Sequence, residues 1–385
     1  MILYVCNIFS DQIRKKRSIL NLNESAYNKV LVNCKFISQF FNIEVLSLGY
    51  GMQNKTKNVY FKLQEEKINK LSINYCQNIN IKYLNAIFSS IYLALNIFKN
   101  KKKYNKVIFY NPLLQYIPAV IICRIYNLEM ILDFEDGQQK SNFFINFFFK
   151  LKILFYNNNI KKFILINENL KKYLQPKNNY IINFGFFDIK KNTPNQNSKN
   201  KITVLFSGNL DYYTGTDVYI DFIEKFYNRD NLLFNEFNFI ITGDGPLKDK
   251  IINKLEKIKK NIELKFDLSA EEYKQILLQT DLAINLRNYN YQISNETFPT
   301  KIIEYSNYKI PIISTRSNEI KNIFCEDEIF FLKKLTTEDL ISTFIRIHEN
   351  KRLKIIKQNL TKKNFNKINI GNTKNMINLL KQVTL

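Results

Sequence analysis

Short apolar segments of strand length alternate with longer segments of helical periodicity along the 385-residue chain. In the first half, Met1–Phe9, Val107–Tyr110 and Met130–Asp133 are apolar and rich in β-branched or aromatic residues, as buried strands are. Segments with helical spacing, such as Glu24–Phe41 and Ile81–Lys99, lie between such runs. Because repeated strand–helix units form parallel sheets with helices on both faces, this alternation predicts an α/β fold.

A polar segment divides the alternation into two parts. Asp188–Asn200 contains one proline and has no apolar periodicity, and the strand–helix rhythm resumes directly after it. We predict an N-terminal Rossmann-like domain over residues 1–190, a linker over 191–200 and a C-terminal Rossmann-like domain over 201–360. Residues 361–385 are expected to form a helix that packs back on the first domain. Ligands of open α/β sheets bind where the strands end, so we expect the chemistry in those loops.

Positive charge is concentrated in the first half of the chain. The net charge is +23, of which residues 1–200 carry +18 and residues 201–385 carry +5. A basic half indicates an anionic partner: a membrane surface, a nucleic acid or a phosphorylated substrate. A cationic surface that merely keeps the protein soluble is the alternative. The clusters at Arg14–Arg17 and Lys99–Lys103 are the expected contacts with anionic lipid.

Residue counts exclude several classes of site. The only histidine is His348, and the five cysteines are scattered without a C-x-x-C motif. A multi-histidine zinc site, an H-E-x-x-H protease and a disulfide-stapled fold are therefore excluded, and we expect no metal site. Apolar stretches such as Phe143–Tyr156 are too short or too charged to span a bilayer, which takes about 18 residues. The expected protein is cytoplasmic, and either soluble or lying on a membrane.

The densest group of candidate functional residues lies in Asn285–Tyr305. A predicted helix opens near Pro299, which suits a first helical turn because its missing N–H is not needed there. The N–H groups of Thr300, Lys301 and Ile302 would then point out of the helix start and form an anion site, to which the Lys301 ammonium adds a charge. Diphosphate would suit this site.

Carboxylates flank the same helix start. Glu296 precedes the predicted helix and Glu304 lies inside it, so one is expected at the mouth of the site and the other further along it. Carboxylates accept hydrogen bonds from sugar hydroxyls. By pattern alone, an N-capped surface helix with solvated charges explains the segment equally well.

Three further clusters follow predicted strands. Gly243-Asp244-Gly245-Pro246 and Ser207-Gly208-Asn209 contain glycines, which let a ligand approach the backbone closely. Asp133–Gly137 contains three carboxylates, which suit sugar binding or proton abstraction. Each of these clusters is also compatible with an ordinary turn.

Taken together, residues 202–320 resemble the nucleotide-binding domain of glycosyltransferase family 4, the retaining GT-B enzymes. Four segments match in order: VLFSGNLDYYTG, FIITGDGPL, ELKFDLSAEEYKQILLQTDLAINL and NETFPTKIIEYSNYKIPIISTRSNEI. The resemblance implies an α/β GT-B fold with two Rossmann-like domains facing a central cleft. It covers the first half in topology only, apart from the segment MILDFEDG.

The resemblance implies roles for individual residues of the second domain. Glu304 matches the glutamate that holds the donor's ribose, and Glu296 matches the one that faces the donor sugar. Gly208 matches the glycine near the diphosphate, and Gly243 and Asp244 match a loop that lines the nucleotide pocket. The other positions that it assigns to donor binding are Asn209, Phe266, Leu268, Thr297, Phe298, Pro299, Thr300 and Lys301.

Two departures from the family's pattern shape the expected chemistry. The first loop, NLDYYTGTD, lacks the Lys or Arg pair of many relatives, so we expect Arg287 and Lys301 to neutralise the diphosphate. The family's frequent first-domain histidine is also absent, and Glu135 or Asp136 is the nearest candidate to replace it. The predicted catalytic residues are therefore Glu296, Lys301, Arg287 and Asp136.

The resemblance implies a retaining, metal-independent hexosyltransferase-like enzyme that uses a nucleoside-diphosphate sugar and needs no cofactor. The expected acceptor is a polyprenyl-linked glycan in the assembly of bacterial capsule, O-antigen or lipopolysaccharide. The basic first half is expected to hold the enzyme peripherally at the inner face of the cell membrane. Two alternatives stay open: a sugar-nucleotide epimerase on the same fold, and a non-catalytic nucleic-acid-binding protein. We expect no nucleic-acid partner, because the basic residues follow no known binding motif.

Overall fold

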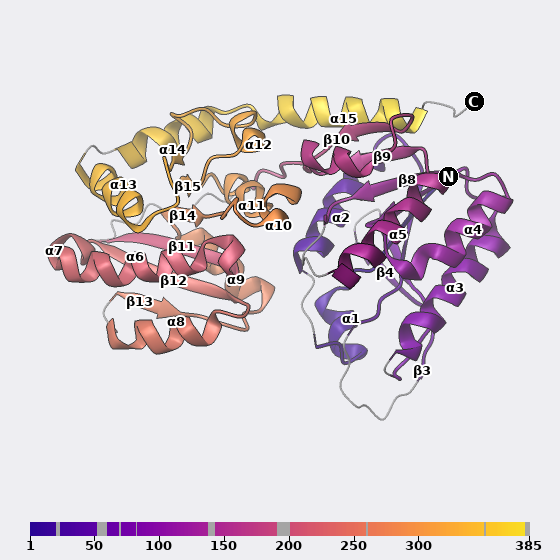
Figure 1. The fold of residues 1–385 in the computed structure, drawn as a ribbon, viewed down its shortest axis with the longest axis horizontal. Helices are drawn as coiled ribbons and strands as arrows, with labels where there is room; N and C mark the ends of the chain where they lie inside the picture. Colours follow the sequence, from indigo (N-terminus) through magenta and orange to yellow (C-terminus); the bar gives the residue numbers. More distant parts are fainter. Residues whose placement is uncertain are drawn as a thin grey trace. The chain divides into compact units, whose positions relative to one another are not determined.

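The structure of the chain is a computed structural model, which describes all residues except 21–23, 52–59, 69–70, 82, 138–142, 191–200, 259–260, 350–351 and 382–385. The chain forms two compact units, Met1–Phe186 with Asn369–Leu385, and Phe187–Ile368. Each is an α/β unit built around its own sheet (Figure 1), which confirms the predicted fold class. The predicted linker, 191–200, lies outside the described residues.

The first unit contains an eight-stranded sheet in which all neighbours pair in parallel except the edge pair β4–β5, which is antiparallel. In sheet order, its strands are β10 (Asn179–Ile182), β9 (Lys162–Leu165), β8 (Glu129–Phe134), β7 (Lys106–Tyr110), β1 (Ile2–Cys6), β2 (Ile43–Ser47), β5 (Leu71–Tyr75) and β4 (Gln64–Ile68). Its helices are α1 (Asp11–Lys16), α2 (Glu24–Ile37), α3 (Leu84–Asn100), α4 (Ile117–Ile125), α5 (Phe143–Asn159) and the larger part of α15 (Phe365–Lys381).

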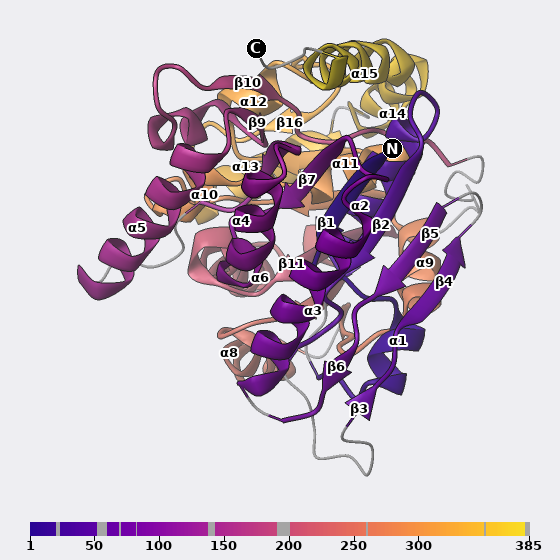
Figure 2. The ribbon, with the colours of Figure 1, turned by 90° about the vertical axis from the view of Figure 1, so that its right-hand side faces the viewer.

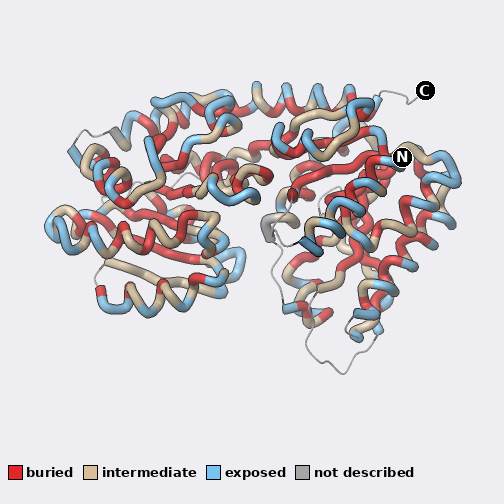
Figure 3. Tube along the Cα trace, viewed as in Figure 1, coloured by how far each residue is buried: buried red, intermediate tan, exposed pale blue. Residues whose placement is uncertain are grey.

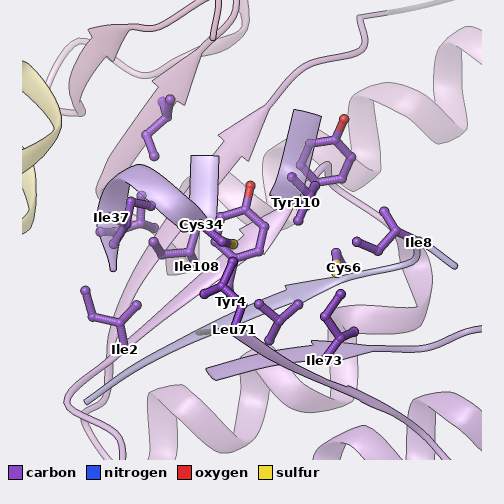
Figure 4. Packing of buried hydrophobic residues seen from close by; sticks show 14 of the residues in the cluster. Ile2, Tyr4, Cys6, Ile8, Cys34, Ile37, Leu71, Ile73, Ile108 and Tyr110 are labelled. Carbon is purple, nitrogen blue, oxygen red and sulfur yellow. The ribbon is translucent and has the colours of Figure 1, made fainter. Parts of the chain in front are cut away.

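Different helices cover the two faces of this sheet. Residues of α2 and α15 share one hydrophobic cluster with alternate residues of the strands, among them Tyr4 and Ile108 (Figure 4). Figure 2 shows α3 and α4 on the other face, and α3 packs on α4. The α5 helix lies beside α4, because the Tyr156 hydroxyl donates to the Leu113 carbonyl at 2.5 Å and Arg124 Nη1 donates to Asn159 Oδ1 at 2.8 Å.

The second unit contains a parallel sheet of six strands. In sheet order they are β13 (Ile262–Leu264), β12 (Phe237–Asp244), β11 (Ile202–Asn209), β14 (Leu282–Asn285), β15 (Ile312–Ser314) and β16 (Phe330–Phe331). The principal helices are α6 (Thr216–Arg229), α8 (Lys248–Leu255), α9 (Ala270–Gln279), α11 (Lys301–Asn307), α13 (Thr337–Glu349) and α14 (Arg352–Lys362). Phenylalanine rings in mutual contact fill much of the core between α6, α13 and the sheet. The strands are largely buried, whereas the helices expose one side to solvent (Figure 3).

The paired strands β11 and β12 each carry a glycine near the end, and the two glycines touch. In the register of β11 and β12, Gly208 lies opposite Gly243. A Cβ on Gly243 would stand 1.8 Å from the Gly208 carbonyl oxygen, and its φ of +137° is one that only glycine adopts readily. Gly243 is therefore needed for backbone packing within the protein, and the close approach that the sequence suggested for a ligand is made here by the neighbouring strand.

The first unit buries an unusual pair of carboxyl groups. Asp133 ends β8 and Glu135 follows it, and both side chains are almost fully buried. Tyr4 donates to Asp133 Oδ2, and Lys29 forms an ion pair with Glu135 Oε2. The other two oxygens, Asp133 Oδ1 and Glu135 Oε1, are buried and accept no hydrogen bond from the described residues. Two buried carboxyls that share one ammonium are more stable when one of them carries a proton.

Burial therefore sets the protonation of this pair. Removal from water raises the pKa of Asp133, and the Lys29 ammonium opposes the rise. Burial also raises the pKa of Glu135 well above its usual range, and the neighbouring Asp133 charge adds to the shift. One cation faces two buried carboxyls, so the folded state holds a proton that the unfolded chain releases.

Some elements were not predicted from the sequence. The edge strand β4 has the sequence QEEKI, which lacks the apolar content used to identify strands. It pairs with β5 by backbone hydrogen bonds, and as an edge strand it needs little buried side-chain surface. Among the described residues, no helix combines the length and apolar character required to cross a membrane.

Alanine substitution should have opposite effects on stability at Gly243, which contacts Gly208, and at Gly371, which has open space around it. Gly243→Ala forces β11 and β12 apart and should destabilise the second unit by more than about 2 kcal/mol. Gly371→Ala, in exposed α15, meets nothing within 4 Å and should stabilise by roughly 0.5–1 kcal/mol, since alanine favours a helix. Urea denaturation of both variants measures the difference, and equal stability of wild type and Gly243→Ala would contradict the packing role.

The buried carboxyl pair predicts a pH-dependent stability. Both folded pKa values are raised, so the stability that the pair contributes is greatest at low pH and falls as pH rises from about 4 through the folded pKa values. Asp133→Asn keeps an acceptor for Tyr4 and gives Glu135 an amide donor without a second charge. Between about pH 5 and about pH 8, its melting temperature should fall less steeply than that of the wild type.

Lys29→Met removes the cation of the cluster instead of a carboxyl group, and its stability is measured in the same way. It leaves the pair without its cation and should lower the free energy of unfolding by about 3–5 kcal/mol near neutral pH. Parallel pH profiles for wild type and Asp133→Asn would show that the two carboxyls do not share a proton.

Candidate functional site

Loops at the carboxyl ends of β11, β12 and β14 bring together most of the predicted residues of the second unit. Parallel strands end at one edge of a sheet, and the loops after them form the surface where ligands of such folds bind. The α11 helix begins at the same edge with Lys301, and α9 supplies Tyr273. The sequence placed Glu296 and Glu304 along one site, and the structure distinguishes their surroundings.

Lys301 and Glu304 form an ion pair at this edge. Lys301 Nζ lies 2.6 Å from Glu304 Oε2, and their side chains are 30% and 29% exposed. The Tyr273 hydroxyl donates to the same carboxylate oxygen at 3.0 Å, and Lys301 Nζ lies 2.9 Å from that hydroxyl and 4.4 Å from the ring centroid. Burial, followed by the Glu304 charge, raises the pKa of Tyr273 well above its usual range. Tyr273 therefore stays a neutral phenol that orients both charges.

The network continues to the end of β11. Ser207 Oγ shares a hydrogen bond of 3.0 Å with the Tyr273 hydroxyl, and the buried Tyr305 hydroxyl donates to the Ser207 carbonyl at 3.5 Å. The next residue, Gly208, has φ +139°, and among the described residues a Cβ there would meet only the Lys301 side chain, at 4.0 Å. The Gly208 backbone thus stands directly beside the aliphatic end of Lys301, with room for a ligand atom.

The predicted anion site at the helix start needs a correction. The α11 helix begins at Lys301, after Thr300 as its N-cap, and not at Pro299. The Ile302 N–H donates to the Pro299 carbonyl at 3.0 Å, because the entry to the helix is a tight turn. Ile302 is therefore not one of the anion donors that the sequence predicted, and the Lys301 side chain carries the positive charge of the site.

Arg287 and Thr297 meet beside this helix. Arg287 follows β14, and its Nη1 donates to Thr297 Oγ1 at 3.4 Å. The Arg287 N–H donates to Thr315 Oγ1 at 3.0 Å, and the guanidinium lies 5.5 Å from the centroid of the Tyr213 ring. These contacts fix a second cation in the loop after β14.

Glu296 lies in a closed environment. It ends the short helix α10 (Gln292–Glu296), its side chain is fully buried, and Gln292 Nε2 donates to Glu296 Oε1 at 2.5 Å. The neighbouring Phe298 and Pro299 are buried as well, and Thr300 is half-buried. Glu296 thus differs from the partly exposed Glu304, and water reaches the two carboxylates unequally.

The remaining predicted residues line the ends of β11, β12 and β13. Asp244 is exposed and lies 3.9 Å from Lys248 Nζ, which also stands 4.8 Å from the centroid of the Phe266 ring. Asn209 Nδ2 donates to the Tyr213 hydroxyl at 2.7 Å. Leu268 is half-buried after β13. An aromatic ring, a lysine and a carboxylate therefore stand together next to the two glycines.

The predicted acidic residue of the first unit is held in a turn after β8. Asp136 is exposed, and Asn111 Nδ2 donates to its Oδ2 at 2.8 Å. Asn111 Oδ1 accepts from the N–H groups of Glu135 and Asp136 at 2.9 and 3.0 Å. Asn111 thereby fixes the Asp136 carboxylate, whereas Glu135 is buried against Lys29 and does not reach solvent.

Sequence reasoning missed Tyr273 and Tyr213 as members of the site, and it named Ser207 only as the residue before Gly208. Tyr273 lies on α9, in a segment whose recognisable signal is the capping box of Ser269 and Glu272. Tyrosines are frequent in this chain, so composition gave no reason to select one. Their role follows only from the way α9, η3 (Tyr212–Thr214) and β11 meet in three dimensions.

Comparison with known proteins supports the predicted fold of the whole chain, and it supports a family for residues 188–365. Residues 188–365 match the family model described as "Glycosyl transferases group 1". No curated protein matches the chain. The predicted GT-B architecture, with two Rossmann-like domains, is confirmed by solved structures that share it.

Three of these structures show the range of similarity. Anabaena Alr3699/HepE, solved with UDP and glucose, has a TM-score of 0.66 at 10% identity, with 99% of each chain covered. An α,α-trehalose-phosphate synthase (UDP-forming) from Burkholderia vietnamiensis has a TM-score of 0.66 at 6% identity, covering 97% of this chain and 98% of that one. The lipopolysaccharide outer core galactosyltransferase WaaB has a TM-score of 0.58 at 14% identity, with 98% of each covered. The chain thus has the fold of GT-B glycosyltransferases, and its residues 188–365 match the group 1 glycosyltransferase family.

Proposed function

We propose that the protein is a retaining, metal-independent glycosyltransferase that moves a sugar from a UDP-sugar to a lipid-linked glycan. The observation that carries the proposal is the cluster of Lys301, Glu304 and Tyr273 beside Gly208, on a domain that matches the group 1 family. Uracil is the proposed base because similar structures were solved with UDP or UDP-glucose. No cofactor takes part in this proposal.

The diphosphate of the donor binds beside Gly208 in this proposal. Lys301 Nζ and the Arg287 guanidinium supply positive charge, and the absent side chain of Gly208 leaves room for phosphate oxygens. Charge develops on the diphosphate as the sugar bond breaks, and fixed cations there stabilise the transition state. In a retaining reaction, the leaving diphosphate accepts the acceptor's proton on the same face of the sugar.

Glu304 binds the ribose hydroxyls of the donor. Both of its hydrogen bonds, from Tyr273 and Lys301, end on Oε2. Among the described residues, none donates a hydrogen bond to Oε1, and the side chain is partly exposed. A carboxylate held in this way accepts hydroxyl hydrogen bonds without losing its own supports. Glu296, which is buried with Gln292, faces the donor sugar in the proposal.

The acceptor binds the first unit, where Asp136 orients it. Asn111 holds the exposed Asp136 carboxylate in place, so that it can accept a hydroxyl hydrogen bond. The excess of positive charge in residues 1–200 supports an acceptor at an anionic membrane, with the enzyme peripheral at its inner face. Fold similarity to the lipopolysaccharide galactosyltransferase supports a role in bacterial surface polysaccharide, whether capsule, O-antigen or lipopolysaccharide core.

Glu304→Ala tests the ribose assignment through ligand binding. UDP at about 100 times its Kd should stabilise the wild type by about 2.7 kcal/mol, with or without EDTA. The variant loses charge-assisted hydrogen bonds to two hydroxyls, so its Kd for UDP should rise by about 10- to 100-fold while that for inorganic diphosphate does not rise. Calorimetry with both ligands measures this.

The matched control is Glu338→Ala, which removes an exposed carboxylate that pairs with Lys225 in the same unit. UDP binding should be unchanged in this variant. An equal loss of UDP and diphosphate affinity in Glu304→Ala would contradict ribose binding, and loss of wild-type binding in EDTA would contradict metal independence.

Lys301→Met tests the stabilisation of the leaving group. Losing a charged hydrogen-bond donor costs about 1.5–3 kcal/mol, so kcat/KM for hydrolysis or transfer of the UDP-sugar should fall by about 10- to 100-fold. The control is Lys225→Met, which removes an exposed ammonium at 3.1 Å from Glu338. Release of UDP over time measures both rates, and an unchanged rate in Lys301→Met would remove this residue from the reaction.

A further inference from the structure

One face of the first unit exposes apolar side chains on the helices α3, α4 and α5. On α3, the buried residues Leu93 and Ile97 face the sheet, yet the opposite side of the helix is apolar as well. The large exposed hydrophobic residues of α3 are Leu84, Ile87, Ile91, Leu95 and Phe98. Those of α4 are Ile121 and Ile125. A surface helix normally carries polar residues on its outer side, so these helices have an unusual second apolar face.

The first half of α5 is the most exposed apolar segment of this face. Phe143 and Phe144 are 77% and 71% exposed, and none of residues 143–150 is buried. Buried residues begin at Ile153, so only the second half of the helix is anchored to the unit. The exposed large hydrophobic residues of α5 are Phe143, Phe144, Ile145, Phe147, Phe148, Leu151 and Leu154. Figure 2 shows the start of α5 projecting from the first unit.

The charge of these helices has one sign. The sequences of α3, α4 and α5 contain no Asp or Glu, whereas Lys99, Arg124 and Lys150 are exposed on them. Lys101, directly after α3, places its ammonium 4.0 and 4.5 Å from the ring centroids of Phe98 and Tyr126. An aliphatic stem on an apolar surface with a charged head at its rim is the arrangement found where helices lie in a membrane interface.

The predicted lipid contact at Arg14–Arg17 needs a correction. Arg17 is fully buried, and its guanidinium donates to the Gly49 and Cys76 carbonyls at 2.8 and 3.0 Å. Arg14 pairs with Asp11 at 3.0 Å. Arg14 and Arg17 therefore serve the fold of the first unit, whereas Lys15 and Lys16 are exposed. The predicted contact at Lys99–Lys103 is the one that adjoins the apolar face.

We propose that the outer face of α3, α4 and α5 docks on an anionic lipid bilayer and that the phenylalanines at the start of α5 enter its interface. The exposed cations pair with anionic headgroups, and the phenylalanines leave water for the acyl boundary. A second copy of the chain would bring the same cations against one another, so the charge favours lipid over self-association. The proposal rests on the proposed function for its lipid-linked acceptor and names the element that brings the enzyme to it.

Vesicle binding by the full-length chain tests the proposal. Wild type should sediment with vesicles of phosphatidylglycerol and phosphatidylcholine and not with phosphatidylcholine alone. A variant with serine at positions 143, 144, 147 and 148 should bind at least about tenfold more weakly. Leu232→Ser is the matched control, since Leu232 is 84% exposed in the second unit. Equal binding by the quadruple variant and wild type would overturn the proposal.

Fluorescence gives a second, independent readout. The chain has no tryptophan, so Phe148→Trp introduces a single reporter in α5. Its emission should shift to shorter wavelength with anionic vesicles and be quenched by brominated acyl chains, whereas that of Leu232→Trp should not change. An unshifted Phe148→Trp spectrum under conditions where the protein sediments with vesicles would show that α5 is not the inserted element.

Three further results separate the proposal from its rivals. UDP affinity and melting temperature should be the same in wild type and the quadruple serine variant. Vesicle binding without UDP binding would overturn the proposed function alone, and UDP binding without vesicle binding would overturn this proposal alone. A wild-type dimer in sedimentation equilibrium that the serine variant abolishes would assign the face to a second copy of the chain.

Discussion

The site in the second unit depends on the close approach of two strand ends. The Gly208 carbonyl occupies the place where a side chain at position 243 would begin, so β11 and β12 stay paired to their last residues. The loops that follow remain in contact, since the Leu210 N–H donates to the Asp244 carbonyl at 2.8 Å. On the side of Gly208 where a Cβ would stand, the Lys301 side chain lies 4.0 Å away and is the one group of the described residues within that distance. The edge beside Lys301 is therefore formed by backbone that carries no side chain.

The charges of this site are arranged so that none depends on the ligand for its position. Lys301 is paired with Glu304, and the neutral Tyr273 hydroxyl bonds both of them and reaches Ser207. Arg287 is fixed separately by Thr297 and the Tyr213 ring. A site whose groups are already oriented loses little conformational entropy when a charged ligand binds. Long side chains without partners in a loop would lose more conformational entropy when a ligand fixed their orientation.

Sequence patterns predicted the strands, the helices and the residues at their ends, and they missed contacts between residues that are distant in the sequence. The alternation of apolar strands and helices identified both α/β units, and the strand ends located Gly208, Arg287 and Lys301. The start of α11 was placed two residues early because a proline can precede a helix as well as open it. Burial of Arg17 could not be read from RKKR, since its partners are carbonyls of residues 49 and 76. Tyr273 escaped notice for the same reason: its partners lie on other elements.

The composition of the segment FFINFFFKLKILFY excludes a helix that spans a bilayer and favours one that lies in its interface. Its two lysines and its length rule out a bilayer span, and a helix buried in a globular core would carry apolar residues toward the rest of the protein. The second half of α5 does so, through Ile153 and Tyr156, whereas none of residues 143–150 in the first half is buried. An interfacial helix needs this division, because half of it must stay bound to the protein while the other half meets lipid. The sheet beneath α5 therefore has a protein core on its α2 face, and on its other face a helical layer whose outer surface fits a second hydrophobic phase.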